Sequence, residues 1–350
     1  MKILLLSAYD VDSHKRWRQT LVRAFQQYTW TVLCLPPRHF RWRIRGNPIS
    51  WSLTHDAELR RDYDLVIATS MVDIATLRGL YPSLADARLL VYFHENQLAY
   101  PCSQQQHTSI DPAMVNIYAA MVADTVAFNS AYNRDSFFQG VEQLIDKLPD
   151  AIEPRLVSAI EAKSRVVPVP LEDELFAQPP AAHGNVLTLA WNHRVEYDKG
   201  IELLLAILIE LKSRRVDFRL ILLGRRFRQV PAAWRQIETE FSAHIVTNGF
   251  AETREHYWRC LRQAHVVLST AEHEFQGLAV MEAVALGCSP VVPDRLSYPE
   301  VFPPGYRYST PGEAVKLILS AEQRRTCDLS GFTWARWLKT YADLLVGKPE

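Results

Sequence analysis

Short apolar runs alternate with amphipathic stretches through the first half of the chain. The amphipathic stretches place apolar residues at helical spacing, as Trp17, Leu21 and Phe25 do. Strands that alternate with helices in this way form a parallel sheet with both faces covered. We expect strands at 1–7, 31–35, 64–70, 88–93 and 124–128, and helices at 15–28, 112–120 and 141–160, the last interrupted by prolines.

The same alternation starts again after a polar, proline-bearing segment. We therefore predict a first α/β domain at 1–170, a linker at 171–185, a second domain at 186–332 and a final helix at 333–350. The strands expected in the second half are 186–191, 218–223, 245–246, 265–270 and 290–292. The helices expected there are 201–211, 234–241, 255–264, one that begins at 278, 314–322 and 334–345.

Composition agrees with two globular domains and adds little chemistry. The chain has 350 residues, a formal net charge of +0 and 48% hydrophobic residues, which is enough for two domains with cores of their own. The five cysteines lack a CxxC pair, so we interpret them as reduced thiols. We see no long apolar run, no signal-peptide pattern and no metal-ligand cluster, so we expect a cytoplasmic protein without a bound metal.

One stretch of the second half combines a strand, an acidic turn and a helix. The apolar run 265–270 is followed by Glu274 and Gly277, and a helix is expected from Leu278. Ligands of parallel α/β sheets bind at such strand ends, where a helix N-terminus attracts an anion. Glu274 and Glu282 frame the turn, and carboxylates accept hydroxyl hydrogen bonds well, so the pair suits a sugar and a ribose. The plain alternative is a solvated acidic turn.

This element resembles the E-x7-E element of retaining GT-B glycosyltransferases. In that family the first glutamate contacts the donor sugar and the second contacts the ribose, which implies these roles for Glu274 and Glu282. Arg194 and Lys199, in the loop after the first strand of the second half, can neutralise a diphosphate. The family uses an arginine and a lysine at this place and needs no metal. The alternative is a surface loop with ordinary charges.

The GT-B resemblance also implies an architecture and a set of donor-binding residues. It implies two facing Rossmann-like domains with a central cleft, a C-terminal helix that packs back on the first domain, and retention of the anomeric configuration. The predicted catalytic residues are Glu274, His94, Arg194 and Lys199. The predicted donor-binding residues are Asn192, Arg194, Lys199, Gly224, Glu274, Gly277, Leu278 and Glu282.

Polar residues also follow the strands of the first half. Members of the GT-B family often place a histidine where His94 stands, against the donor sugar, whereas the alternative is a buried structural histidine. The usual glycine pair of the first loop is absent, and Asp12-Ser13-His14-Lys15 stands in its place. The predicted acceptor-side residues are Ser13, His14, Ser70, His94, Asn96, Asn129 and Ser130.

Four sequence blocks give a more specific resemblance, to the tRNA-queuosine mannosyltransferase family. They are 13–15, 69–73, 92–101 and 191–199. The resemblance implies transfer of mannose from GDP-mannose to the cyclopentenediol of queuosine in the anticodon of tRNA-Asp, with no further cofactor. The same chemistry on a glycolipid or small-molecule acceptor is one alternative. A nucleotide-sugar epimerase, or a tRNA-binding protein with a decayed site, is another.

A basic stretch near the N-terminus offers a candidate RNA contact. Residues 1–61 hold eleven Lys/Arg against four Asp/Glu, and four arginines alternate with aromatic residues between 38 and 45. Arginines interleaved with aromatic rings suit phosphates and unstacked bases. A solvated basic loop is the alternative. The predicted RNA-binding residues are Arg38, Arg41, Trp42, Arg43 and Arg45.

Overall fold

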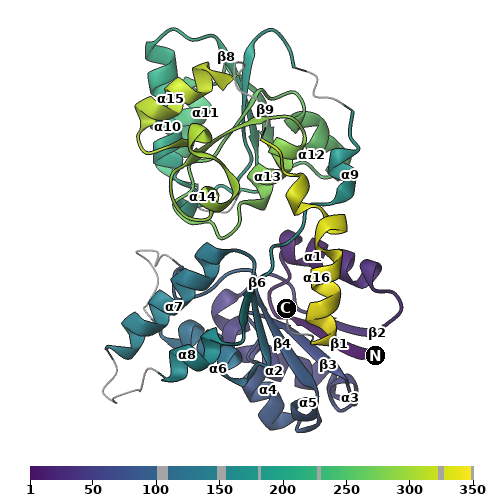
Figure 1. Ribbon diagram of the computed structural model, residues 1–350. Coiled ribbons are helices and arrows are strands. Elements are labelled where there is room, and N and C mark those ends of the chain that lie inside the picture. The colour runs from purple at the N-terminus through teal and green to yellow at the C-terminus, as the bar shows by residue number, and fades with distance from the viewer. Residues whose placement is uncertain (101–108, 148–154, 180–182, 227–229, 322–326, 348–350) are drawn as a thin grey trace. The chain divides into compact units, whose positions relative to one another are not determined.

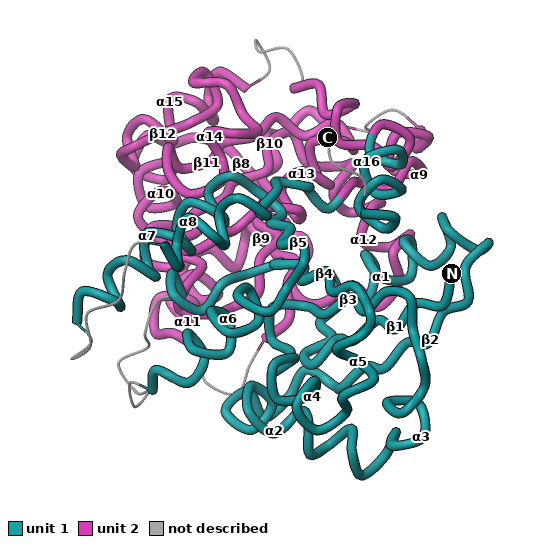
Figure 2. The backbone as a smooth tube through the Cα atoms, turned by 60° about the horizontal axis from the view of Figure 1, so that its bottom comes forward, with its two compact units in different colours: residues 1–169, 337–350 teal, residues 170–336 magenta. Residues whose placement is uncertain are grey.

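The computed structural model describes residues 1–100, 109–147, 155–179, 183–226, 230–321 and 327–347 (Figure 1). The chain divides into two compact units, residues 1–169 with 337–350 and residues 170–336 (Figure 2). Each contains a six-stranded parallel sheet with helices packed against it, as the alternating pattern predicts. The two units are described separately below.

Unit 1 is built on a sheet whose strand order is β2-β1-β3-β4-β5-β6. Its strands are β1 (Lys2–Ser7), β2 (Thr29–Cys34), β3 (Leu65–Thr69), β4 (Arg88–Phe93), β5 (Thr125–Phe128) and β6 (Ser164–Val166). Its helices are α1 (Asp12–Ala24), α2 (Phe40–Thr54), α3 (Asp56–Leu59), α4 (Ile74–Leu80), α5 (Ser83–Asp86), α6 (Asp111–Val122), α7 (Ala131–Ile145) and α8 (Arg155–Glu161). Strand residues 3–6 and 65–68 are fully buried, because a parallel sheet covered on both faces leaves neither face in water.

The last helix, α16 (Trp334–Val346), packs on unit 1, which confirms that the chain returns to its first domain (Figure 1). Trp17 of α1 donates its indole N–H to the Tyr341 hydroxyl at 3.0 Å. Tyr341 in turn donates to the carbonyl of Pro168 at 3.1 Å, and Arg88 donates to the carbonyl of Leu344 at 3.0 Å. These bonds tie the helix to α1, β4 and the end of the first sheet.

Unit 2 has the strand order β12-β11-β10-β7-β8-β9. Its strands are β7 (Leu187–Trp191), β8 (Phe218–Leu223), β9 (Ile245–Gly249), β10 (Val266–Leu268), β11 (Ser289–Pro293) and β12 (Arg307–Tyr308). Its helices are α9 (Asp173–Phe176), α10 (Ile201–Ser213), α11 (Ala232–Glu240), α12 (Arg254–Leu261), α13 (Leu278–Ala285), α14 (Tyr298–Val301) and α15 (Pro311–Leu319). This is the doubly wound nucleotide-binding order, in which the direction of winding reverses between β7 and β10.

Several expected boundaries are wrong. The stretch taken as a basic loop begins helix α2 at Phe40, and α1 begins at Asp12 rather than at Lys15. The segment expected to be an unstructured linker contains α9, and Leu171 pairs with Thr333 in an isolated bridge. Strand β6 was missed, because its three residues include an arginine and leave no apolar run to read. The expected helix 141–160 is two helices, α7 and α8, and residues 148–154 lie outside the described part.

Candidate functional site

The reversal point of the second sheet brings the two predicted donor-binding loops together. Strand β10 pairs directly with β7. The loop after β7 carries Asn192 and Lys199, and the loop after β10 carries Glu274. In open α/β sheets the crevice for ligands lies outside the carboxyl ends of the strands at this reversal. The sheet order therefore places these loops where a nucleotide ligand would bind.

Lys199 contacts three groups, one in its own loop and two in the loop after β10. Its ammonium group donates to the carbonyl of His273 at 2.7 Å and lies 3.1 Å from Asp198 Oδ2 and 3.5 Å from Glu274 Oε2. The lysine side chain is only 8% exposed. The two carboxylates and the carbonyl hold this ammonium group in place, so its position at the strand ends is fixed.

Glu274 is held in its ionised form. Burial by itself would raise the pKa of this carboxyl, but Lys199, two histidines and the backbone N–H of Gly277 lower the pKa to about 2. Gly277 adopts a φ of 80°, in the left-handed region, directly before α13. This conformation favours glycine and turns the N–H group toward the carboxylate. A permanently ionised carboxylate is a hydrogen-bond acceptor for hydroxyl groups.

Two glycines allow the loops to lie against each other. A Cβ on Gly224, at the end of β8, would stand 1.8 Å from the carbonyl oxygen of His193, and a Cβ on Gly200 would stand 2.0 Å from that of Thr270. Thr270 also accepts a hydrogen bond from the Trp191 indole at 3.0 Å and donates one to the Lys199 carbonyl at 2.7 Å. The contribution of Gly224 is therefore that it lets its own backbone lie in contact with the backbone of His193.

The remaining donor-side residues take different positions. Asn192 is buried and donates to the Tyr257 hydroxyl at 2.9 Å and to the carbonyl of Ala279 at 2.7 Å, so it fixes the start of α13. Glu282 is buried within α13, which begins at Leu278. Arg194 pairs with Glu196 at 3.0 Å and is 44% exposed. The two predicted cations thus have different partners: Lys199 lies beside Asp198 and Glu274, and Arg194 lies beside Glu196.

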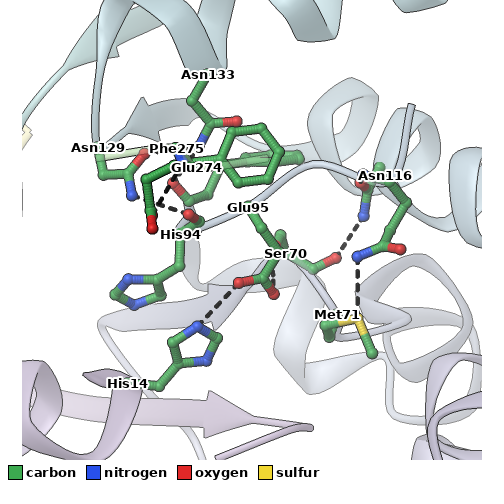
Figure 3. A network of polar contacts seen from close by, with 12 residues as sticks. His14, Ser70, Met71, His94, Glu95, Asn116, Asn129, Asn133, Glu274 and Phe275 are labelled. Atoms are coloured by element: carbon green, nitrogen blue, oxygen red, sulfur yellow. Dashed lines mark hydrogen bonds and ion pairs between the residues drawn. The ribbon is translucent and has the colours of Figure 1, made fainter. Parts of the chain in front are cut away.

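In unit 1, His14, Ser70 and Glu95 meet at the carboxyl ends of the strands (Figure 3). His14 Nε2 lies 3.0 Å from Glu95 Oε2, and Ser70 donates its hydroxyl to Glu95 Oε1 at 3.4 Å. The His14 ring stacks on His94 with 4.1 Å between ring centroids. Burial, and then the neighbouring His14, lower the pKa of His94 well below its usual value, so His94 is a neutral imidazole. Ser13 lies beside His14 in the first turn of α1 and is half-buried.

Three predicted acceptor-side residues hold the backbone of this region in place. Asn129 donates to the carbonyl of His94 at 2.8 Å. Ser130 caps α7 by accepting from the backbone N–H of Asn133 at 2.9 Å. The amide nitrogen of Asn96 donates to Asn133 Oδ1 at 2.9 Å, and its oxygen accepts from the backbone N–H groups of residues 98 and 99. Their polar atoms organise the loop that presents His94 and Glu95.

The basic stretch divides into two sets of side chains. Arg45 pairs with the buried carboxylate of Asp73 at 2.7 Å, and Arg43 is buried and donates to the Ser50 hydroxyl at 3.2 Å. Arg38, Arg41 and Trp42 are exposed, as is the Arg45 side chain, which is 50% exposed beside its ion pair. We correct the expectation of a uniform basic loop: the structure gives helix α2 two arginines that support the fold and a separate exposed group.

Sequence reasoning missed three residues that lie in these arrangements. Glu95 lies in the sequence block 92–101 and His193 lies in the block 191–199, but nothing in the sequence distinguishes them from their neighbours. His193 is buried, and its pKa is lowered to about 4 by burial and by Lys199, so it is neutral at pH 7. Asp198 is buried beside Lys199. A carboxylate directly before the predicted cation was the one available signal for Asp198.

The two units match different protein families. Residues 2–171 match the family described as tRNA-queuosine alpha-mannosyltransferase N-terminal, and residues 173–321 match glycosyl transferases group 1. A tRNA-queuosine alpha-mannosyltransferase of Drosophila melanogaster is 32% identical over 328 residues, covering 90% of this chain and 85% of the fly protein. This chain belongs to the tRNA-queuosine alpha-mannosyltransferase family. The predicted membership is confirmed.

Solved structures place this family member in the GT-B fold. Anabaena Alr3699/HepE in complex with UDP-glucose superposes with a TM-score of 0.65 at 15% identity, over 99% of this chain and 100% of that one. The lipopolysaccharide outer core galactosyltransferase WaaB, in its apo form, gives a TM-score of 0.63 at 13% identity, over 99% of each chain. The fold is therefore GT-B with two Rossmann-like domains, and the family membership makes this protein a hexosyltransferase. Within the described residues, no helix is long and apolar enough to cross a membrane.

Proposed function

We propose that this enzyme transfers mannose from GDP-mannose to queuosine in the anticodon of tRNA-Asp, with retention of the anomeric configuration, in the cytoplasm. The family membership carries the proposal for mannose and queuosine, because the fly relative bears that name across most of its length. The pairing of buried Lys199 with the half-buried Glu274 supports the donor half. The exposed residues at the start of α2 support the RNA half.

In the proposed donor site, the cations and α13 bind the leaving diphosphate. Lys199, Arg194 and the N-terminus of α13, which begins at Leu278, stabilise the charge that develops as the sugar–phosphate bond breaks. Glu274 accepts hydrogen bonds from sugar hydroxyls, and Glu282 accepts them from the ribose. A new bond forms from the anomeric carbon to an acceptor hydroxyl, whose proton passes to a leaving diphosphate oxygen. Because fixed cations neutralise the diphosphate, the proposed reaction uses no metal.

In the proposed RNA contact, Trp42 provides a stacking surface. A Cβ on Gly46, one helical turn later, would stand 2.5 Å from the Trp42 ring, so the absence of a side chain lets the indole lie along α2. The ring remains 50% exposed. An exposed, supported indole suits an unpaired base, and the exposed Arg38 and Arg41 suit the phosphates on either side.

Mass spectrometry of tRNA nucleosides tests this function. Cells that carry the gene are expected to contain hexosylated queuosine, which disappears on deletion and returns with the wild-type gene. A Glu274→Gln gene serves as the matched control, since it keeps the shape of the side chain and removes its charge. Purified protein with GDP-mannose and queuosine-bearing tRNA-Asp should give the same product. An unchanged nucleoside profile after deletion would contradict the proposal.

A further inference from the structure

The Glu95 carboxylate is bound by side chains from two strand ends that flank the winding reversal of the first sheet. The direction of winding changes between β1 and β3, so ligands are expected at the carboxyl ends of these strands. Two of its partners come from either side of that reversal: His14, which follows β1, lies 3.0 Å from the carboxylate, and Ser70, which follows β3, lies 3.4 Å from it. Figure 3 shows the carboxylate lying between the two side chains.

The contacts fix the orientation of the carboxylate without enclosing it. The Glu95 side chain is 20% exposed, whereas that of His14 is 4% exposed. Each carboxylate oxygen carries more than one lone pair, so each can accept a second hydrogen bond beside the one from His14 or Ser70. A half-covered carboxylate with its rotamer fixed from two sides is preorganised for a ligand.

The surroundings of Glu95 define the chemistry of that ligand. A carboxylate repels phosphate and attracts hydroxyl groups, and its two oxygens match two neighbouring hydroxyls. The stacked rings of His14 and His94, with Trp17 edge-on to His94 at 4.7 Å, form a flat wall beside it. Two ring nitrogens in this wall, His14 Nδ1 and His94 Nε2, are buried and have no hydrogen-bond partner among the described residues. The group that fits is a neutral ring bearing a vicinal diol.

We infer that Glu95 binds the vicinal diol of the acceptor and selects acceptors that carry both hydroxyls. This inference rests on the proposed function, in which the acceptor is the cyclopentenediol of queuosine. Glu95 contacts the acceptor in this account, whereas Glu274 contacts the donor sugar. His14 and Ser70 are positioning residues, because they act by holding the Glu95 carboxylate.

A comparison of Glu95→Gln with wild type on two acceptors tests the inference. The acceptors are tRNA bearing queuosine and tRNA bearing a queuosine analogue that keeps only the hydroxyl that receives the hexose. Wild type should prefer the diol by roughly 10- to 100-fold in kcat/KM, the value of a hydrogen bond to a charged group. Glu95→Gln should lose most of this preference, while its KM for the sugar donor stays within about twofold. Such a coupled loss reports a direct contact.

Controls separate this inference from a structural role and from the proposed function. Asp135→Asn, on the exposed face of α7, also removes one acidic charge from unit 1 and should leave the preference intact. Ser70→Ala removes a hydrogen bond that positions the carboxylate and should lose part of the preference. A Glu95→Gln protein that keeps the wild-type preference, or whose donor KM rises instead, overturns the inference alone. Wild-type protein that modifies neither acceptor overturns the proposed function together with the inference.

Discussion

Replacing Lys199 by Met removes the charge that keeps Glu274 ionised and leaves a side chain of similar volume. A pKa lowered from 4.5 to about 2 corresponds to about 3 kcal/mol in favour of the ionised carboxylate, at about 1.4 kcal/mol per pH unit. Lys199 is the largest of several interactions that lower this pKa, and the Glu274 side chain is 22% exposed, so we expect a loss of about 2 kcal/mol at pH 7. The lost hydrogen bond to the His273 carbonyl adds about 1 kcal/mol at every pH.

The pH dependence identifies the source of this loss. A carboxyl whose pKa is lowered by folding stabilises the folded state above its unfolded pKa of about 4.5, and this stabilisation disappears as pH falls toward about 2. In Lys199→Met, burial is no longer opposed by the ammonium charge, so the pKa of Glu274 rises. The difference in unfolding free energy between wild type and variant should therefore shrink by about 1 kcal/mol between pH 7 and pH 3.

Urea unfolding of both proteins at pH 7 and pH 3 measures this difference. Lys316→Met on α15 is the matched control, because it removes an exposed lysine from the same unit and should change the unfolding free energy little at either pH. An equal loss at both pH values would refute the electrostatic reasoning and assign the effect to packing. No loss at pH 7 would show that Lys199 does not hold the Glu274 charge.

Three further predictions test the proposed site. Glu282→Ala should weaken the binding of GDP-mannose by at least tenfold in calorimetry, because the ribose loses its acceptor, and an unchanged affinity would remove that role. Replacing Arg38 and Arg41 by Ala should weaken tRNA binding and lower the slope of log affinity against log salt by about 2, whereas a slope equal to that of wild type would exclude phosphate contacts. Hexose transfer should survive EDTA, and loss of transfer that added Mg²⁺ restores would contradict the metal-free reaction.

The sequence predicts the strands of this protein better than its helix ends. Buried parallel strands are continuous apolar runs, so β4 at 88–93 and β8 at 218–223 have the predicted bounds. Helix α2 has no such signal, since Gly46 and Pro48 interrupt it and its apolar residues follow no helical repeat. Tertiary contacts stabilise it instead: buried Asn47 donates to the Met71 carbonyl at 3.2 Å and accepts from the backbone N–H of Asp73 at 3.2 Å.

The residues of the candidate site were also predicted only in part. Glu274 and Lys199 were predicted from motifs with a definite spacing, and the structure pairs them. Glu95 stands beside a predicted histidine, but nothing in the sequence distinguishes it from Asn96. The difference becomes visible only in the fold, where the Asn96 amide bonds to Asn133 of α7 and to the backbone N–H of Ala99, and Glu95 keeps part of its surface exposed.

In both units, a glutamate that follows one strand is contacted by a side chain that follows another strand. Lys199 follows β7 and meets Glu274 after the neighbouring β10, while His14 follows β1 and meets Glu95 after β4. The partners are 75 and 81 positions apart in sequence, so only the strand order brings them together. A carboxylate fixed in this way costs solvation energy that an apolar contact would not cost. One such carboxylate in each unit fits the proposed reaction, in which Glu274 binds hydroxyl groups of the donor sugar and Glu95 binds those of the acceptor.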